Sequence, residues 1–237
     1  FLLNVSLRSK FSNVRVVNLS EVKIGVVIPA FNASSTIETV LKAIPGFVSK
    51  VIVVVDACKT GTGEALARSN FSNHSRVTVL HNVENIGVGG STIRGMKYAL
   101  EHFQLDVIVK IDADGQIDPG LIEPLVSELV NRDLDYVKGN RLNWERLDFK
   151  MPKSRLIANN LATLFFKIST GFWNLGDPAN GFFGVQMITL RKLNLDSLKK
   201  RWFFESDMLG ELAVNGAKVG DFPMKPVYGD EKSNVKL

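Results

Sequence analysis

The sequence has few of the residues that cross-link or ligate small proteins. Its 237 residues include one cysteine, Cys58, so no disulfide can form within the chain. Its three histidines, His74, His81 and His102, lack the spacing of a zinc site. Hydrophobic residues make up 45% of the chain and charged residues 22%, so a substantial core can be buried and disorder throughout is excluded.

Long hydrophobic runs are also missing. No apolar segment approaches the ~20 residues that cross a bilayer, because Asn160, Lys167 and Asn174 interrupt the best candidate. The opening FLLNVSLRSK lacks an initiator Met and has its basic residues after the apolar stretch, unlike a signal peptide. We therefore expect a soluble, cytoplasmic protein, with the inner face of the membrane as the alternative location.

The balance of charged residues is compatible with several classes of binding partner. Lysine and arginine number 29 and acidic residues 24, a net charge of +5. This balance is compatible with an anionic membrane or a phosphate-rich substrate. Nucleic-acid binding would need basic and aromatic residues in clusters. The positive charges are scattered, so we expect no nucleic-acid partner.

Strand and helix patterns alternate through the first 140 residues. Pro29 is expected to end the first strand, because proline cannot donate to a sheet. Ser35-x-x-Glu38 predicts a capping box for the first helix, and Asp118-Pro119 opens a later one. The other predicted elements are strands at Ile24–Ile28, Lys50–Val55, Arg76–Leu80 and Asp106–Ile111, and helices at Gly63–Phe71 and Ser91–Phe103.

Repeated β-α-β units predict an α/β fold, a mainly parallel sheet with helices on both faces. After Gly139 the pattern is less regular. No linker appears, so we expect one domain over residues 23–228, between an extension (1–22) and a polar tail (229–237). Its last third is expected to hold a helix at Pro152–Thr170, a turn at GDPANG, a strand at Phe183–Ile188, a helix at Phe204–Val214 and a strand at Lys218–Phe222.

Three polar clusters follow predicted strands, where open α/β sheets bind ligands. In the third, Asp112, Asp114 and Gln116 can direct oxygen atoms at one hard cation, such as Mg²⁺ or Mn²⁺. The structural alternative is a solvated acidic turn. Asp56, in the first cluster, could bind a base or ribose, or cap a helix.

The second cluster is rich in glycine. Gly87-x-Gly89-Gly90 would let backbone approach a ligand closely, and the following helix would present amides that favour negative charge. A tight turn is the equally simple structural reading. The cluster is neither a Walker loop nor a Rossmann fingerprint, which should follow the first strand.

Seven segments together carry a family resemblance. They are, in order, IGVVIPAFNASSTI, VIVVVDACKTGT, NIGVGGSTIRGMKYAL, VIVKIDADGQIDP, KGNRL, DPANGF and FFESDML. The series, spanning roughly Lys23–Tyr228, resembles family 2 nucleotide-diphospho-sugar glycosyltransferases of the GT-A fold. It is most like the dolichyl-phosphate mannose synthase-like branch, whose metal motif reads Asp-Ala-Asp-x-Gln. The resemblance implies a nucleotide-sugar half at about 23–140 and an acceptor half at about 141–228.

The resemblance implies roles at matching positions of the donor end. Two positions depart from the family pattern: Ala33 stands where Glu is usual, and Ala57 replaces the second Asp of an Asp-Asp pair. Both lie at the nucleoside end, so we do not choose between UDP, GDP and other sugar nucleotides. The implied nucleotide-sugar contacts are Pro29, Ala30, Asn32, Asp56, Gly89, Gly90 and Asp112, and the implied metal and diphosphate site is Asp112, Asp114 and Gln116.

The acceptor end carries the implied catalytic groups. Arg141 matches an arginine that handles phosphate in the polyprenyl-phosphate branch, where Lys138 or Arg155 would assist. Asp207 matches the acidic motif that supplies a general base for a saccharide hydroxyl, and Asp177 is the second candidate. The implied reaction is a metal-dependent, inverting transfer from a nucleotide-diphospho-sugar to a polyprenyl phosphate or a saccharide.

Two alternatives stay open. The segment Leu156–Leu175 has helical apolar spacing with nearby cations, which fits either a peripheral membrane contact or a core helix. The altered nucleoside motif also leaves room for a non-catalytic module that binds sugar nucleotides or glycans.

Overall fold

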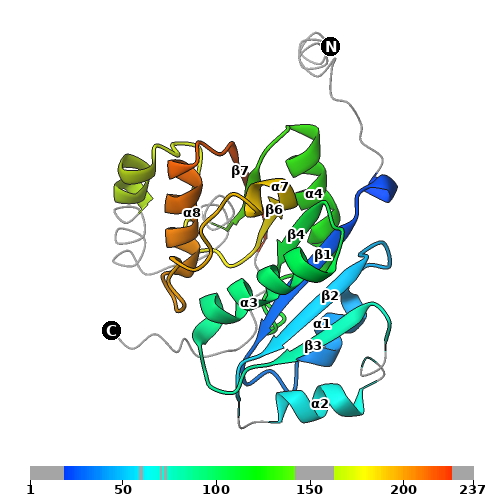
Figure 1. The fold of residues 1–237 in the computed structure, drawn as a ribbon. Coiled ribbons are helices and arrows are strands. Elements are labelled where there is room, and N and C mark those ends of the chain that lie inside the picture. The colour runs from blue at the N-terminus through cyan, green and yellow to red at the C-terminus, as the bar shows by residue number, and fades with distance from the viewer. Residues whose placement is uncertain (1–18, 59–60, 70, 72–73, 142–162, 226–237) are drawn as a thin grey trace.

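A single sheet forms the centre of the molecule. The structure, a computed structural model, describes residues 19–58, 61–69, 71, 74–141 and 163–225. Seven strands lie in the order β3-β2-β1-β4-β6-β5-β7 (Figure 1). β6 runs antiparallel to β4 and β5, and the other pairs are parallel, which confirms the predicted mainly parallel α/β sheet. The strands are β1 (Ile24–Ala30), β2 (Lys50–Val55), β3 (Val77–His81), β4 (Val107–Lys110), β5 (Tyr136–Asn140), β6 (Phe183–Gln186) and β7 (Val219–Pro223).

Helices cover both faces of this sheet. α1, α2 and α4 contribute to one hydrophobic cluster and α3, α7 and α8 to the other, so β1, β2 and β4 are buried on both sides. This explains why these strands read as continuous apolar runs. The helices are α1 (Ile37–Ala43), α2 (Thr62–Arg68), α3 (Gly87–His102), α4 (Ile122–Asn131), α7 (Met187–Leu190) and α8 (Phe204–Val214), with short 3₁₀ turns at Leu19–Glu21 and Pro119–Leu121.

The predicted end of the first strand is wrong. β1 continues through Pro29, which pairs with Val54 of β2. Ala30 accepts a hydrogen bond from Asp56 on the β2 side, and Val27 accepts one from Ile111 on the β4 side. Since successive residues alternate sides, the missing N–H of Pro29 faces β4, beyond its last paired residue.

The predicted capping box is also wrong. The N-cap of α1 is Thr36, whose hydroxyl donates 2.6 Å to the carbonyl oxygen of Ala113 and so leaves the helix uncapped by a side chain. At the Pro119 turn the prediction is confirmed, because the Asp118 carboxylate accepts a hydrogen bond from the Gly120 amide at 2.8 Å. α3 begins one turn earlier than predicted, so the glycine-rich segment is helical.

One strand that the sequence pattern did not predict, β5, lies in the middle of the chain, just before its less regular last third. The helix predicted from Pro152 falls partly outside the described residues, and residues 163–170 are helical. The strand predicted at Phe183–Ile188 is shorter, because α7 begins at Met187. Helix Phe204–Val214 is confirmed at both ends.

The topology brings the predicted clusters to one edge of the sheet. The carboxyl ends of β1, β2, β4 and β5 lie there because these strands run in one direction. β6 runs the opposite way, so its first residue, Phe183, lies at the same edge and pairs with both Lys110 and Lys138. Among the described helices, none is long and apolar enough to cross a membrane.

Candidate active site

The acidic loop after β4 is held by contacts on both sides. The Asp114 carboxylate accepts a hydrogen bond from the Gln116 amide at 2.9 Å, and Gly115 turns the chain with a φ of +78°. Thr36 of the α1 N-terminus binds the carbonyl of Ala113. Asp114 is exposed, and the side chain of Asp112 keeps 29% of its surface exposed. The loop therefore presents two carboxylates and an amide side chain at the edge of the sheet.

A buried lysine lies directly beneath this loop. Lys110 ends β4, its side chain is 1% exposed, and its ammonium donates 2.7 Å to Asp112 and lies 3.4 Å from Glu205 of α8. Burial alone would lower the pKa of Lys110, but the charges and hydrogen bonds of Asp112 and Glu205 raise it overall. The lysine therefore stays charged and fixes the orientation of Asp112.

Close packing holds the other Asp112 oxygen in place. A Cβ at Gly181 would lie 2.4 Å from Asp112 Oδ2 and 2.6 Å from Lys110 Nζ. Any side chain at this position would therefore displace the carboxylate. A larger residue would require these two ion-paired groups to shift, which favours glycine as the last residue of the GDPANG segment.

The loop can be tested for its fit to a divalent ion. No group of three or more His, Cys, Asp or Glu side chains that could hold a metal occurs among the described residues. The donors are instead Asp112, Asp114 and Gln116, two carboxylates and an amide, which are the oxygen ligands that Mg²⁺ and Mn²⁺ prefer. Such a set is incomplete alone, and it fits an ion whose remaining ligands are phosphate oxygens and water.

A second buried lysine faces the same site. Lys138 of β5 and Lys110 of β4 both pair with Phe183, so their side chains lie on the same face of the sheet, on either side of Phe183. Lys138 Nζ lies 5.7 Å from the centroid of the Phe183 ring and donates to the carbonyl of Asn180. Burial lowers the pKa of Lys138 to about 8, against the opposing charges of Glu205 and Asp177; Lys110 and Arg141 lower it further.

We expect this lysine to make stability depend on pH. In the unfolded chain Lys138 keeps its ordinary pKa of 10.5, so above pH 8 the unfolded state binds more protons than the folded one. The free energy of unfolding should then rise with pH between about 8 and 10.5. Denaturant unfolding of the wild type and Lys138→Met on either side of pH 8 measures this. The free energy of unfolding of the wild type should rise relative to that of the variant as the pH rises. If the two free energies change with pH in parallel, the expectation is contradicted.

Tyr136 lies beneath the lysines. Its ring stacks on Phe183 with centroids 5.1 Å apart, and its buried hydroxyl has no hydrogen-bond partner within the described part of the chain. Burial, and then the charge of Glu205, raise the pKa of Tyr136 well above 10. The phenol therefore stays neutral and adds no negative charge to the cluster.

Arg141 and Asp177, predicted independently, form an ion pair. Asp177 is 5% exposed and accepts hydrogen bonds from Arg141 Nε at 2.8 Å and Nη2 at 3.2 Å. The Arg141 side chain remains 34% exposed. Asp177 therefore holds a cation at the surface of the site, beside Lys138, which senses the charge of both residues.

Glu205, rather than Asp207, faces this cluster. Asp207 lies one half-turn further along α8 and accepts a hydrogen bond from the Lys199 amide at 2.8 Å. Glu205 is 7% exposed and contacts Lys110. A role of Asp207 as general base stays a prediction, and its observed contact is with the loop before α8.

Asp56 contacts its own chain. It is 2% exposed, and its carboxylate accepts hydrogen bonds from Asn82 Nδ2 at 2.6 Å, the Ile86 amide at 2.9 Å and the Gly87 amide at 2.8 Å. The carboxylate thus binds the first amides of α3, which is the helix-capping alternative. A contact with a nucleotide base stays a prediction.

The glycines of α3 pack against the loop before α8. The Gly90 amide donates 2.8 Å to the carbonyl of Lys200. A Cβ at Gly87 would lie 2.6 Å from that oxygen, and one at Gly89 would lie 2.5 Å from Phe204 Cβ. Close approach of protein accounts for these glycines, and the predicted contacts of Gly89 and Gly90 with a donor remain untested.

The predicted nucleoside end has unusual backbone. Asn32, after β1, and Ala57, after β2, have positive φ of 54° and 49°. Asn adopts this conformation readily, whereas Ala pays a steric cost. Ala33 is buried, and its amide donates 3.0 Å to Thr62. Pro29 and Ala30 are buried in β1, and their contact with a nucleotide stays a prediction.

Sequence reasoning missed Lys110, Glu205, Asn180 and Gly181, and named Lys138 only as an assistant to Arg141. One signal was present: Lys110 is the single charge in an otherwise apolar strand, VIVKI. A charge there requires a buried partner. Its partner, Glu205, is 95 residues away, and spacing could not identify it.

Comparisons with known proteins give a family match for the chain. The family model described as Glycosyl transferase family 2 matches residues 25–193. The undecaprenyl-phosphate mannosyltransferase of Micrococcus luteus is 30% identical over 208 residues, covering 84% of this chain and 81% of the relative. The UDP-N-acetylglucosamine–dolichyl-phosphate N-acetylglucosaminyltransferase of Methanococcus voltae is 27% identical over 214 residues, covering 85% and 84%.

A solved structure shares the fold. Glucosyl-3-phosphoglycerate synthase from Mycobacterium tuberculosis, in complex with Mn²⁺, UDP and glucosyl-3-phosphoglycerate, aligns with a TM-score of 0.62 and 21% identity, covering 90% of this chain and 74% of that one. The GT-A fold is thereby shown. With the family match over most of the chain, it follows that this protein is a glycosyltransferase and belongs to glycosyltransferase family 2.

Proposed function

We propose that this glycosyltransferase moves a sugar from a nucleotide-diphospho-sugar to the phosphate of a polyprenyl phosphate. The observation that carries the proposal is the cationic end of the site. Lys110, Lys138 and Arg141 lie around one sheet edge, next to the carboxylate loop that fits a divalent ion. A leaving diphosphate and an attacking phosphate are both anionic, and the positive charge of two buried lysines and one part-exposed arginine favours their binding here.

The donor end rests on Asp112, Asp114 and Gln116. These residues would hold Mg²⁺ or Mn²⁺, and a bound ion supplies Lewis-acid stabilisation of the leaving diphosphate. Lys110 holds Asp112 in one orientation, so the loop need not reorganise when the donor binds. The Mn²⁺ and UDP in the complex of the mycobacterial synthase support this assignment.

The acceptor end favours a phosphate over a hydroxyl. A saccharide hydroxyl needs a carboxylate to remove its proton, with Asp207 or Asp177 as candidates. Asp177 is engaged by Arg141, and Asp207 accepts a hydrogen bond from the Lys199 amide, so both candidate carboxylates already have partners within the chain. A phosphate arrives already anionic and needs no base; Arg141, whose side chain is 34% exposed, can bind it. The relatives named for undecaprenyl- and dolichyl-phosphate support this acceptor.

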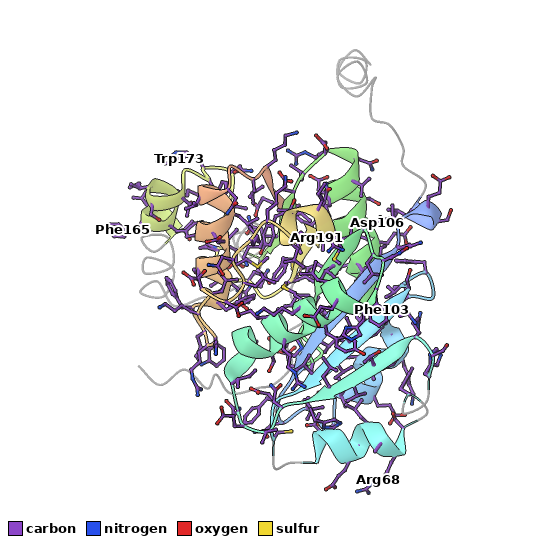
Figure 2. The ribbon with its side chains drawn as sticks, viewed as in Figure 1. Arg68, Phe103, Asp106, Phe165, Trp173 and Arg191 are labelled. Atoms are coloured by element: carbon purple, nitrogen blue, oxygen red, sulfur yellow. The ribbon has the colours of Figure 1, made fainter. Side chains whose placement is uncertain are left out.

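A lipid acceptor places the enzyme beside a membrane. Helix 163–170 exposes Leu164 (45%), Phe165 (69%) and Ile168 (62%), while Phe166 packs against the hydrophobic core. Figure 2 shows Phe165 and Trp173 at the outer edge of the molecule, directed away from its body. We propose peripheral association with a membrane, with inversion of configuration at the transferred sugar.

Donor turnover tests this proposal. The purified protein is incubated with several sugar nucleotides, with and without Mn²⁺, and nucleoside diphosphate release is followed. We expect release that requires the metal and a polyprenyl phosphate and ignores free sugars. Release with saccharides alone would overturn the lipid-phosphate acceptor. Arg141→Ala should raise the KM for the lipid phosphate with little change in that for the donor.

A further inference from the structure

One short loop before α8 combines cations and exposed aromatic residues. Its five consecutive residues, Lys199–Phe203, read KKRWF, and all are exposed. Trp202 is 85% exposed and Phe203 is 63% exposed. Large aromatic side chains normally bury most of their surface, so two adjacent ones in solvent require an explanation. This cluster is the exception to the otherwise scattered positive charge.

The backbone of this loop is fixed. Its carbonyl at Lys200 accepts from the Gly90 amide at 2.8 Å, and its amide at Lys199 donates 2.8 Å to Asp207. A side chain on Gly89 would collide with the carbonyl of Lys199, which lies 2.7 Å from the Cβ position. The loop is thus packed against α3, and its side chains are exposed by a defined backbone rather than by a loose one.

The loop also lies at the site edge of the sheet. Two residues after Phe203, Glu205 contacts Lys110 beneath the acidic loop. The N-terminus of α3, on which the loop packs, follows the carboxyl end of β3. A surface that binds the loop would therefore lie next to the site.

We propose that Lys199–Phe203 is a membrane-contact element that enters the headgroup layer of an anionic bilayer. Tryptophan and phenylalanine favour the boundary between headgroups and acyl chains, and lysine and arginine attract anionic lipids. The cations and the aromatic residues of the loop thus both indicate an anionic bilayer as its partner. The inference deepens the proposed function, since it presents the site to an acceptor carried in that bilayer.

Vesicle binding tests the loop directly. Full-length protein is sedimented with vesicles of phosphatidylcholine alone, or mixed with phosphatidylglycerol. We expect the wild type to prefer the anionic vesicles. Lys199→Glu/Lys200→Glu should weaken that binding by at least about 30-fold, because each lost cation contributes about 1 kcal/mol near the surface and each glutamate adds repulsion from the anionic lipids. Trp202→Ala/Phe203→Ala should weaken it roughly tenfold.

A matched control lies at the opposite edge of the sheet. α7 begins beside Asp106, before β4, and carries an exposed Ile188 (62%) followed by the exposed pair Arg191 and Lys192. Figure 2 shows Arg191 beside α7. Ile188→Ala and Arg191→Glu/Lys192→Glu should leave vesicle binding unchanged. Equal losses in control and loop variants would overturn the proposal.

Activity separates this inference from the proposed function. Transfer to a short-chain prenyl phosphate that dissolves in water should be the same in the wild type and the loop variants, whereas transfer to polyprenyl phosphate in vesicles should fall. If no prenyl phosphate is glycosylated, the acceptor assignment fails while the vesicle assay still tests the loop. Vesicle binding lost only in Phe165→Ala/Ile168→Ala, or lost with the cations but not the aromatics, would overturn the loop as a membrane contact.

Discussion

Lys110→Met is expected to lower the free energy of unfolding by about 3 kcal/mol, because it leaves buried carboxylates without their cation. Leaving Glu205 without a cation should cost more stability than leaving Asp112 without one. The side chain of Glu205 is 9% exposed, whereas that of Asp112 is 29% exposed. The variant should also lose activity, since Asp112 would no longer be oriented. Denaturant unfolding and donor turnover measure the two effects separately.

A double variant distinguishes the loss of the ion pair from the loss of side-chain packing. Lys110→Met/Glu205→Gln should recover part of the stability, because the amide carries no charge that needs a partner. Lys42→Met serves as the control, because its pair with Glu38 is exposed, and it should change stability little. Additive losses in the double variant would show that the ion pair is not the source of the effect.

Asp114→Ala is expected to reduce metal-dependent turnover by about 10³-fold while the protein stays folded. Lewis-acid stabilisation of a leaving diphosphate is worth several kcal/mol, and each 1.4 kcal/mol corresponds to roughly tenfold in rate. Asp114 is exposed, so its removal should cost little stability. Turnover titrated with Mn²⁺, together with Mn²⁺ binding measured by calorimetry, gives the result.

Asp118→Ala is the control on the same loop. Its carboxylate caps the turn that opens α4, so its loss should cost about 1 kcal/mol of stability without affecting the metal titration. The two aspartates should therefore show opposite profiles, one in activity and the other in stability. Full activity in Asp114→Ala would remove that residue from the metal site.

The buried strands were predictable because they are apolar throughout. β2 matched its predicted bounds, and the polar residues after β2 and β4 lie at the predicted edge. The pattern could not fix element ends that depend on distant contacts. Pro29 stays in β1 because no partner needs its amide, and Thr36 rather than Ser35 begins α1 because its hydroxyl reaches Ala113.

β5 was missed for a related reason. Its sequence, YVKGN, contains a lysine and a glycine that interrupt the apolar pattern. Both are explained by contacts with distant residues: Lys138 donates to the carbonyl of Asn180, and a Cβ at Gly139 would lie 2.5 Å from the sulfur of Met224. The lysine that interrupts the apolar pattern of β5 is thus a residue of the candidate site.

Some residues of the candidate site could be identified from sequence motifs, whereas others could be identified only from the structure. Asp112, Asp114, Arg141 and Asp177 were identified from motifs, and the structure joins the last two as a pair. The pairing of Lys110 with Glu205 joins β4 to α8 and could be found only in three dimensions.

The order of strands also limits how this enzyme can be recombined with its relatives. β6, from the acceptor half, lies between β4 and β5, so a crossover near residue 140 would cut through a continuous sheet. A chimera that exchanges residues 141–228, the predicted acceptor half, must keep Glu205 and Gly181 together with Lys110. Otherwise the buried ion pair between Lys110 and Glu205 would lose one of its partners.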